Sequence, residues 1–299
     1  MPDVAILIKY SAIVNNFLED MSVLQHFNAI SKSRLAPYSA LCKNAYPGEL
    51  QFSLSKRTIC IYTALQHRAS IFSSLIQEIE ISVRNEMTQI IKQNLTQNND
   101  LLSHFCFLAI DKTTKLSPYS QNELKSCLIK LLNNTLPPNY SVQHLNNTNY
   151  AYQRLIQQNI SADDIIANMT FGFWVNLINN NKRKNPNYLY WNNIFYRKIF
   201  NNRFNTIPQL FNDLRDVRDF RNRLSHQDAV WSKSARTPSE ALKNMEITYK
   251  RYDLLLSKLS PYRHHFRKVS TYLSWQESFN FDTDIFNAEI DSMMSNSFI

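Results

Sequence analysis

The segment "IFSSLIQEIEISVRNEMTQI", residues 71–90, decides the class of fold. Most of its apolar residues recur at intervals of three or four, the spacing that places side chains on one face of an α-helix. This apolar stripe consists of Phe72, Leu75, Ile76, Ile79, Val83, Met87 and Ile90. Almost no helix-breaking residue occurs from about Ser55 to Leu95, so we expect one long core helix, with a bend or a split near Ser70 as an open alternative.

Glycine is scarce in the chain, which narrows the fold further. Only two of the 299 residues are glycine, Gly48 and Gly172. Parallel α/β folds and barrels use glycine at tight turns, and Walker or dinucleotide cradles need glycines close together. We therefore predict an all-α fold and exclude nucleotide cradles of these types. Hydrophobic residues make up 44% of the chain, which is enough for a substantial core.

Local signals predict where further helices begin. Ser120 with Glu123 three residues later resembles a capping box, so we expect the helix of segment 118–136 to open at Ser120. Thr206 is expected to cap a helix that carries Pro208 in its first turn, where the missing N–H of proline is tolerated.

One further helix is expected across residues 161–180, opened by Ser161. Asp163 and Asp164 would then lie at its positive end, where carboxylates are favoured. Gly172 lies between two aromatic residues of the same segment, which suggests that another helix approaches closely there.

The balance of charge indicates a class of partner. The formal net charge is +9 and the sequence pI is about 9.3. Such a balance favours a polyanionic partner, either nucleic acid or an anionic membrane surface. A basic protein without such a partner is the alternative.

The cysteines and the apolar segments indicate a compartment. Cys42, Cys60, Cys106 and Cys127 sit among apolar residues and form no C-x-x-C pair, so we expect buried thiols in a reducing compartment. No apolar run approaches the roughly 18 residues of a membrane span. We therefore expect a soluble cytoplasmic protein without membrane contact, and with no cofactor and no metal cluster.

A second segment, "RDFRNRLSHQDAVW" at residues 218–231, concentrates chemically useful side chains near a helix end. On a helical wheel an apolar face opposes a cationic stripe, and Arg221 lies at the boundary between the two. The apolar face consists of Leu214, Val217, Phe220 and Leu224, and the stripe consists of Arg215, Arg218, Asn222 and His226.

Such groups suit the cleavage of RNA without a metal ion. The 2′-hydroxyl of RNA attacks the adjacent phosphate, a histidine moves protons, an arginine neutralises charge on phosphorus, and an amide orients one of them. Because RNA supplies its own nucleophile, no serine or cysteine nucleophile is required. The alternative is an exposed basic helix end whose histidine has no chemical role.

The segment "RNRLSH", residues 221–226, fits the R-x4-H pattern of the HEPN ribonuclease superfamily, and the chain more narrowly resembles its Abi (abortive infection) family. Three segments resemble family motifs in the right order: "SKSRLAPYSALC" resembles S-x-x-R-L-x-x-Y, "LIQEIEISVRNEM" resembles L-E-x-x-x-R-N, and "NMTFGFWVNLI" resembles L-T-F-G-F-W. "LRDVRDFRNRLSHQDAVW" then resembles L-R-x-x-R-N-R-x-x-H-H-E-P-I-[FW]. The resemblance runs from about Ser31 to about Tyr262.

The resemblance implies that Arg221 and His226 are the catalytic pair and that Asn222 is their polar helper. The chain departs from the family directly after His226, where Gln227 replaces the second histidine that many members have. One imidazole therefore remains in each chain.

Other residues enter with smaller roles. Glu80, Arg84 and Asn85 match the motif of the other helix and are predicted to support the site, together with Arg218. Glu80 and Arg84 have the spacing of a helical ion pair, so a structural pair within the bundle is an equally open alternative. The predicted RNA contacts are Arg215, Arg223, Lys182, Arg183 and Lys184.

HEPN enzymes typically build their site at a dimer interface, so the resemblance implies a homodimer with RNA as its substrate. It also implies a toxin-like endoribonuclease of antiphage abortive infection or of a toxin–antitoxin system, restrained by a small-RNA or protein antitoxin. Apolar surface near "NMTFGFWVNLI" or in residues 272–281 is expected to hold the dimer. A non-catalytic RNA-binding member, or a protein-interaction module that senses a phage component, stays open.

The resulting fold prediction is an all-α, HEPN-like helical bundle with additional N- and C-terminal helical segments. We expect an N-terminal helical segment over residues 1–54, the HEPN-like domain over residues 55–267 and a C-terminal tail over residues 268–299.

Overall fold

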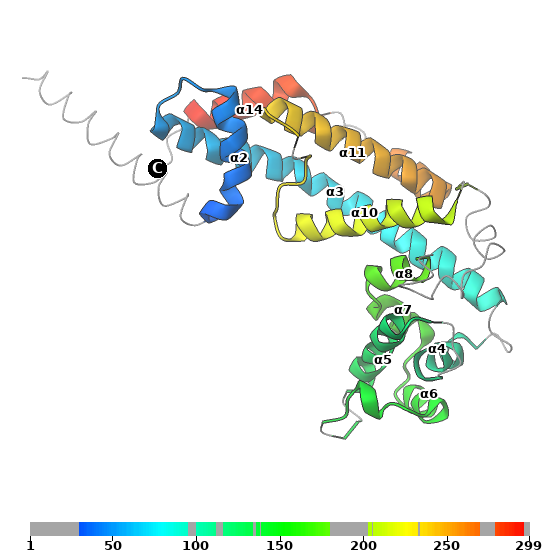
Figure 1. Cartoon of the computed structure of the whole chain (residues 1–299). Helices are drawn as coiled ribbons and strands as arrows, with labels where there is room; N and C mark the ends of the chain where they lie inside the picture. The colour runs from blue at the N-terminus through cyan, green and yellow to red at the C-terminus, as the bar shows by residue number, and fades with distance from the viewer. Residues whose placement is uncertain are drawn as a thin grey trace, which may run out of the picture. The chain divides into compact units, whose positions relative to one another are not determined.

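The structure of the chain is a computed structural model, and it describes residues 30–94, 100–111, 116–133, 136–137, 139–179, 203–204, 206–232, 234–269 and 279–295. All the regular elements in these ranges are helices, which confirms the predicted all-α class (Figure 1). The helices are α2 (Lys32–Ala45), α3 (Gln51–Asn94), α4 (Leu101–Ile110), α5 (Pro118–Leu132), α6 (Thr148–Gln157), α7 (Ala162–Asn168), α8 (Phe171–Leu177), α10 (Ile207–Ser225), α11 (Pro238–Leu259), α12 (Pro261–Val269) and α14 (Thr283–Ser295), with a short 3-10 turn η1 at Val142–His144.

The chain divides into two compact units. Unit 1 consists of Met1–Leu75, Phe220–Asp253 and His265–Ile299, and unit 2 of Ile76–Asp219 and Leu254–His264. Neither unit is a continuous stretch of sequence. The predicted domains 1–54, 55–267 and 268–299 are continuous ranges of sequence, so the two units do not correspond to them. This domain division stays a prediction.

The long helix α3 is built on its predicted apolar stripe. Phe72, Leu75, Ile79 and Val83 are fully buried along it. The helix is continuous through Ser70, so the split considered there does not occur. A periodic apolar face is enough to fix such an element, because burial of that face stabilises the helix more than intrinsic propensity does.

In unit 1, α3 lies beside α10 and α11 (Figure 1). Aromatic side chains join these helices. The ring centroid of Phe72 lies 4.6 Å from that of Phe220, 5.4 Å from that of Tyr249 and 6.3 Å from that of Tyr252. Aromatic pairs at such distances add to the stabilisation that burial of their area provides. The last turns of α10 are therefore fixed from their apolar side.

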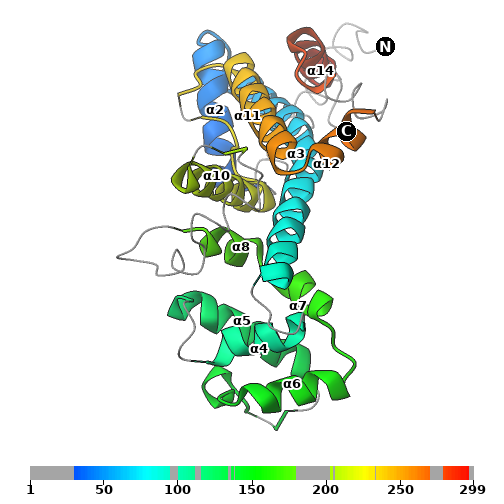
Figure 2. The ribbon, with the colours of Figure 1, turned by 90° about the vertical axis from the view of Figure 1, so that its right-hand side faces the viewer.

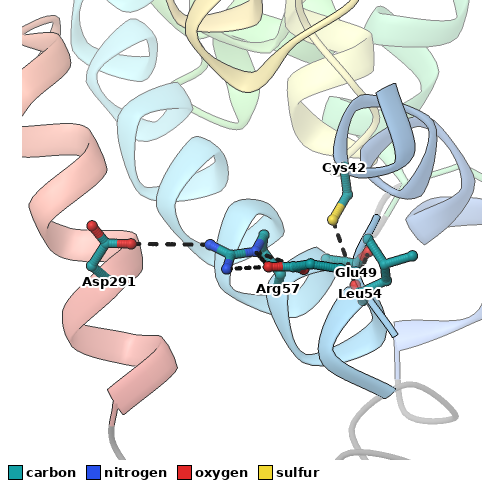
Figure 3. Close-up of polar contacts among 6 residues, drawn as sticks. Cys42, Glu49, Leu54, Arg57 and Asp291 are labelled. Carbon is teal, nitrogen blue, oxygen red and sulfur yellow. Dashed lines mark hydrogen bonds and ion pairs between the residues drawn. The ribbon is translucent and has the colours of Figure 1, made fainter. Parts of the chain in front are cut away.

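Helix α14 attaches to α3 through two charged pairs, of which Figure 3 shows the one between Arg57 and Asp291. The Arg57 guanidinium binds both carboxylate oxygens of Glu49, and it lies 4.0 Å from Asp291 of α14. Arg68 and Glu289 form a second link, with 2.5 Å between nitrogen and oxygen. The C-terminal segment thus carries a packed helix, in line with the additional C-terminal helical segment that was predicted.

In unit 2, α4, α5, α6 and α7 pack against one another (Figure 2). Helix α5 contributes three fully buried leucines to this core, namely Leu124, Leu128 and Leu132. Helix α8 contributes Trp174, which is also fully buried. The segment "NMTFGFWVNLI" was expected to offer apolar surface to a dimer, but Phe171, Phe173, Trp174, Val175, Leu177 and Ile178 are all buried within the chain. The hydrophobic surface of these six side chains is therefore already covered within the chain. The other expected dimer surface, residues 272–281, lies largely outside the described residues, and the dimer contact stays a prediction.

The start of α5 differs from its prediction. Ser117 caps this helix, because its hydroxyl oxygen accepts a hydrogen bond of 3.2 Å from the backbone N–H of Ser120. Pro118 takes the first helical position, where the lack of an N–H costs nothing. Ser120 is buried inside the helix, and Glu123 accepts a hydrogen bond from the Thr170 hydroxyl, so the expected capping box is wrong.

The predicted helix over residues 161–180 is two helices. Ser161 opens α7 as expected, through a capping box with Asp164. That helix ends at Asn168, however, and Thr170 caps α8 by accepting a hydrogen bond of 3.2 Å from the backbone N–H of Phe173. A hydroxyl at this position satisfies a backbone donor at the start of the new helix, which stabilises a break in an otherwise apolar segment.

The four cysteine thiols are buried and free, as predicted. Burial raises the pKa of Cys60 and Cys127 to about 11 and that of Cys106 to about 12. At neutral pH these thiols are therefore protonated and unreactive, and they act as small apolar residues of the core.

Candidate functional site

Helix α10 carries the predicted catalytic residues, and it forms where the sequence places it. Thr206 caps the helix by accepting a hydrogen bond of 3.2 Å from the backbone N–H of Gln209. Leu214, Val217 and Phe220 are buried. The predicted apolar face is therefore confirmed at these three positions, whereas its fourth member, Leu224, is half-buried. This burial directs the opposite face of α10 outward.

The side chains predicted to act on RNA are accessible. Arg221, Asn222 and His226 are exposed, as are the predicted RNA contacts Arg215 and Arg223. Arg218 is half-buried, and its guanidinium donates to Asp219 at 2.8 Å. A Cβ atom at Gly172 would lie 3.9 Å from Cδ of Arg218, which is an ordinary van der Waals distance. The contact therefore leaves room for a side chain, and the close helix approach expected at this glycine is not borne out.

The C-terminal end of α10 is closed by a defined hydrogen-bond pattern. The backbone N–H of Gln227 donates to the Leu224 carbonyl at 3.0 Å, and that of Asp228 donates to the Arg223 carbonyl at 2.9 Å. Gln227 has a φ of 56°, in the left-handed region. These features define a Schellman motif, in which His226 is the C-cap residue and Gln227 is the residue beyond it.

The left-handed position allows a stability prediction. We expect Gln227→Gly to increase the free energy of unfolding by about 0.5–1 kcal/mol, because glycine adopts a positive φ without steric cost. The loss of a long contact between the Tyr62 hydroxyl and the Gln227 side chain, at 3.5 Å, offsets little of that gain.

Unfolding in urea measures the change, and α6 supplies the matched control. Gln158 is also an exposed glutamine at a helix end, but its φ is −95°, so Gln158→Gly should lower stability. A loss of stability in Gln227→Gly equal to that in Gln158→Gly would show that the left-handed conformation of Gln227 carries no strain.

Side chains of α2 and α3 hold the segment that follows His226. The side-chain amide of Gln66 donates to the Gln227 carbonyl at 3.0 Å and to the Tyr38 hydroxyl at 2.7 Å. The Tyr38 ring makes edge contacts with Tyr62 and Trp231, with ring centroids 5.0 Å and 4.8 Å apart. Tyr38 is fully buried, and burial raises the pKa of its hydroxyl.

These contacts unite two segments that the sequence marks separately. Tyr38 belongs to "SKSRLAPYSALC" and Trp231 closes "RDFRNRLSHQDAVW". Sequence reasoning did not identify Gln66, because nothing in its local pattern links it to residues so far along the chain. The one sequence feature that could have pointed to this contact was Tyr38, which matches the tyrosine of the family motif in "SKSRLAPYSALC".

The other predicted supporting residues lie in unit 2. Arg84 pairs with Glu80, and its guanidinium also donates to the carbonyls of Ile166 at 3.3 Å and Ala167 at 3.2 Å. The side chains of Arg84 and Glu80 are only 17% and 12% exposed. Arg84 therefore links α3 to the C-terminal end of α7, where a positive charge is favoured. Asn85 is exposed, and a role of these three residues in catalysis stays a prediction.

The predicted RNA contacts of the segment 182–184 have no counterpart among the described residues. Lys182, Arg183 and Lys184 lie outside the described residues. No group of three or more His, Cys, Asp or Glu side chains in the described ranges could hold a metal ion. Across the same ranges, none of the helices has the length and apolar character needed to cross a membrane.

The fold and the site define an all-α protein with an exposed arginine, asparagine and histidine at one helix end. The family model described as Abi-like protein matches residues 25–232. Because the match covers more than half of the 299 residues, the chain belongs to the family of Abi-like proteins. This family suggests a role in abortive infection. Comparisons with curated proteins and with solved structures give no match.

Proposed function

We propose that the protein is a metal-independent endoribonuclease of the HEPN type that acts in abortive infection or in a toxin–antitoxin pair. One observation carries the proposal: Arg221, Asn222 and His226 are exposed on the last turns of a helix whose apolar face is buried. A rigid element that presents a cation, an amide and an imidazole to solvent suits a substrate as large as RNA.

In the proposed reaction, the 2′-oxygen of RNA forms a bond to the adjacent phosphorus as its proton passes to an imidazole. The bond from phosphorus to the 5′-oxygen then breaks, and that oxygen receives a proton from an acid. Arg221 neutralises the charge that develops on the phosphate oxygens, and Asn222 orients one of the reacting groups. The products are a 2′,3′-cyclic phosphate and a 5′-hydroxyl.

The reaction needs both a base and an acid, and each chain supplies one motif imidazole. The amide of Gln227 cannot replace the second histidine, because it neither gains nor loses a proton near neutral pH. We therefore propose a homodimer in which a two-fold axis brings His226 and its counterpart together. Two arginine-bearing faces repel each other, so RNA phosphate in the cleft should stabilise the dimer.

Restraint is part of the proposal, since a free ribonuclease would damage its host. A small RNA could cover Arg221 and its neighbours electrostatically, and a protein antitoxin could do so with an acidic surface. The non-catalytic alternative, a protein that binds RNA on the same face without cutting it, is an outcome of the test below.

The class of reaction is tested with a single-stranded RNA in EDTA. We expect cleavage without added metal, products that end in a 2′,3′-cyclic phosphate, and no cleavage of RNA with 2′-O-methyl groups, because methylation removes the nucleophile. DNA of the same sequence is the matched control and should stay intact. Strict dependence on magnesium with 5′-phosphate products would contradict the mechanism, and binding without cleavage would support the non-catalytic alternative.

A further inference from the structure

The peptide that follows the predicted catalytic histidine is tied to a side chain of α3. The Gln66 amide nitrogen donates to the Gln227 carbonyl at 3.0 Å and to the Tyr38 hydroxyl at 2.7 Å. A glutamine amide carries two N–H donors, so both hydrogen bonds can form at once. Gln66 therefore bridges α2 and the end of α10, and all these groups belong to unit 1.

Tyr38 makes the bridge rigid on one side. Its side chain is fully buried, and its ring lies in edge contact with both Tyr62 and Trp231. A buried aromatic ring held by two others keeps its hydroxyl at one place. Because burial also raises the pKa of Tyr38, the hydroxyl stays neutral over the physiological range and is a stable acceptor for Gln66.

The other end of the bridge lies one peptide away from the imidazole. Gln227 is in the left-handed conformation, and the N–H groups of Gln227 and Asp228 close the Schellman motif around His226. A shift of the Gln227 carbonyl therefore moves the backbone of His226 with it. A misplacement of about 1 Å can lower the rate of a catalysed reaction about 10²-fold.

We propose that Gln66 is a positioning residue, which holds His226 in place through the Gln227 carbonyl and takes its own position from Tyr38. The proposal rests on the proposed ribonuclease function, because it assigns Gln66 to the same site. It also gives Tyr38 of the segment "SKSRLAPYSALC" a structural role, because the end of α10 is aligned from the fixed position of this tyrosine.

The first part of the test measures catalysis at a temperature well below unfolding. Gln66→Met removes both N–H donors at nearly constant volume, and Tyr38→Phe removes the acceptor while keeping the ring. We expect kcat of Gln66→Met to fall about tenfold or more with KM little changed, because the histidine is misplaced and RNA binding is not. Tyr38→Phe should lower kcat in the same sense.

The double variant Gln66→Met with Tyr38→Phe should be no slower than Gln66→Met alone, because the two residues act as one unit. Gln77→Met is the matched control, since Gln77 is an exposed glutamine of the same helix, and it should retain the wild-type kcat. A folded Gln66→Met protein with wild-type kcat, or with a raised KM alone, would overturn the positioning role.

The second part needs no catalysis. Amide hydrogen exchange at Gln227 and Asp228 should become faster in Gln66→Met while α10 keeps its protection. Unchanged exchange at these two amides would overturn the bridge. If Gln66→Met does not fold, Tyr38→Phe carries both measurements, and wild-type kcat in that variant would overturn the proposal. A wild-type protein that cuts no RNA would overturn the proposed function, and the exchange measurement would then decide on the bridge by itself.

Discussion

Replacing His226 with alanine should lower the rate of RNA cleavage by about 10²–10⁴, the usual effect of losing a positioned acid–base group. The side chain is exposed at the C-cap of α10, so its removal leaves the buried face of the helix intact. Arg221→Ala should cause a loss of similar size, because the charge that develops on phosphorus then lacks its counter-charge. Gel analysis of RNA products over time measures both variants.

The matched control for this loss is His265→Ala. His265 is also an exposed histidine on a helix, but it lies on α12 and the proposed mechanism does not use it. If His265→Ala cleaves RNA at the wild-type rate and His226→Ala is much slower, the loss of rate depends on where the imidazole lies. Unchanged cleavage by a folded His226→Ala protein would contradict the proposed mechanism.

Mixed dimers extend the same experiment to the shared site. When one chain carries His226→Ala and the other is wild type, the proposed shared site retains only one imidazole. We expect the heterodimer to lose much of its activity, because an acid and a base are both required. A monomer that cuts RNA at full rate would show that the second imidazole is not needed.

The sequence predicts what depends on neighbouring residues. The cap at Thr206 follows from the residue types at the start of α10, and the structure has it. The buried face through Leu214 and Val217 and the exposed positions Asn222 and His226 follow from helical spacing, and the structure has them too. Prediction from neighbouring residues becomes ambiguous where two nearby residues can both cap the same helix. Ser117 and Ser120 both resemble a helix cap, and the deciding residue is Pro118, which fits the first position of a helix and disfavours a helical residue before it.

Contacts between distant segments could not be predicted in the same way. The hydrogen bond from Gln66 to Gln227 spans 161 positions of the chain, and neither residue has a neighbour that signals the other. Gln66 lies on a partly exposed face of α3, and its neighbours in the sequence signal no partner. The bridge follows only once packing has placed α2, α3 and the end of α10 together in unit 1.

Glu289→Ala should destabilise the protein by about 3 kcal/mol, because it leaves a buried guanidinium without its counter-charge. The Arg68 side chain is 1% exposed, whereas Glu289 is 29% exposed. Arg68 keeps a hydrogen bond of 3.0 Å to the Ala64 carbonyl and a position 4.7 Å from the centre of the Phe286 ring. Neither contact neutralises its charge, so most of the penalty remains.

Because Arg68 is buried and Glu289 is partly exposed, the two single variants should lose different amounts of stability. Arg68→Met should cost less than Glu289→Ala, because water can reach the carboxylate that remains. The double variant Arg68→Met with Glu289→Met should recover part of the stability, since two apolar side chains carry no desolvation penalty. Urea unfolding measures all three variants.

Glu246→Ala is the control: Glu246 pairs with the exposed Lys250, and such surface pairs contribute at most about 1 kcal/mol. Equal losses in Glu246→Ala and Glu289→Ala would mean that burial of Arg68 does not govern the strength of its pair.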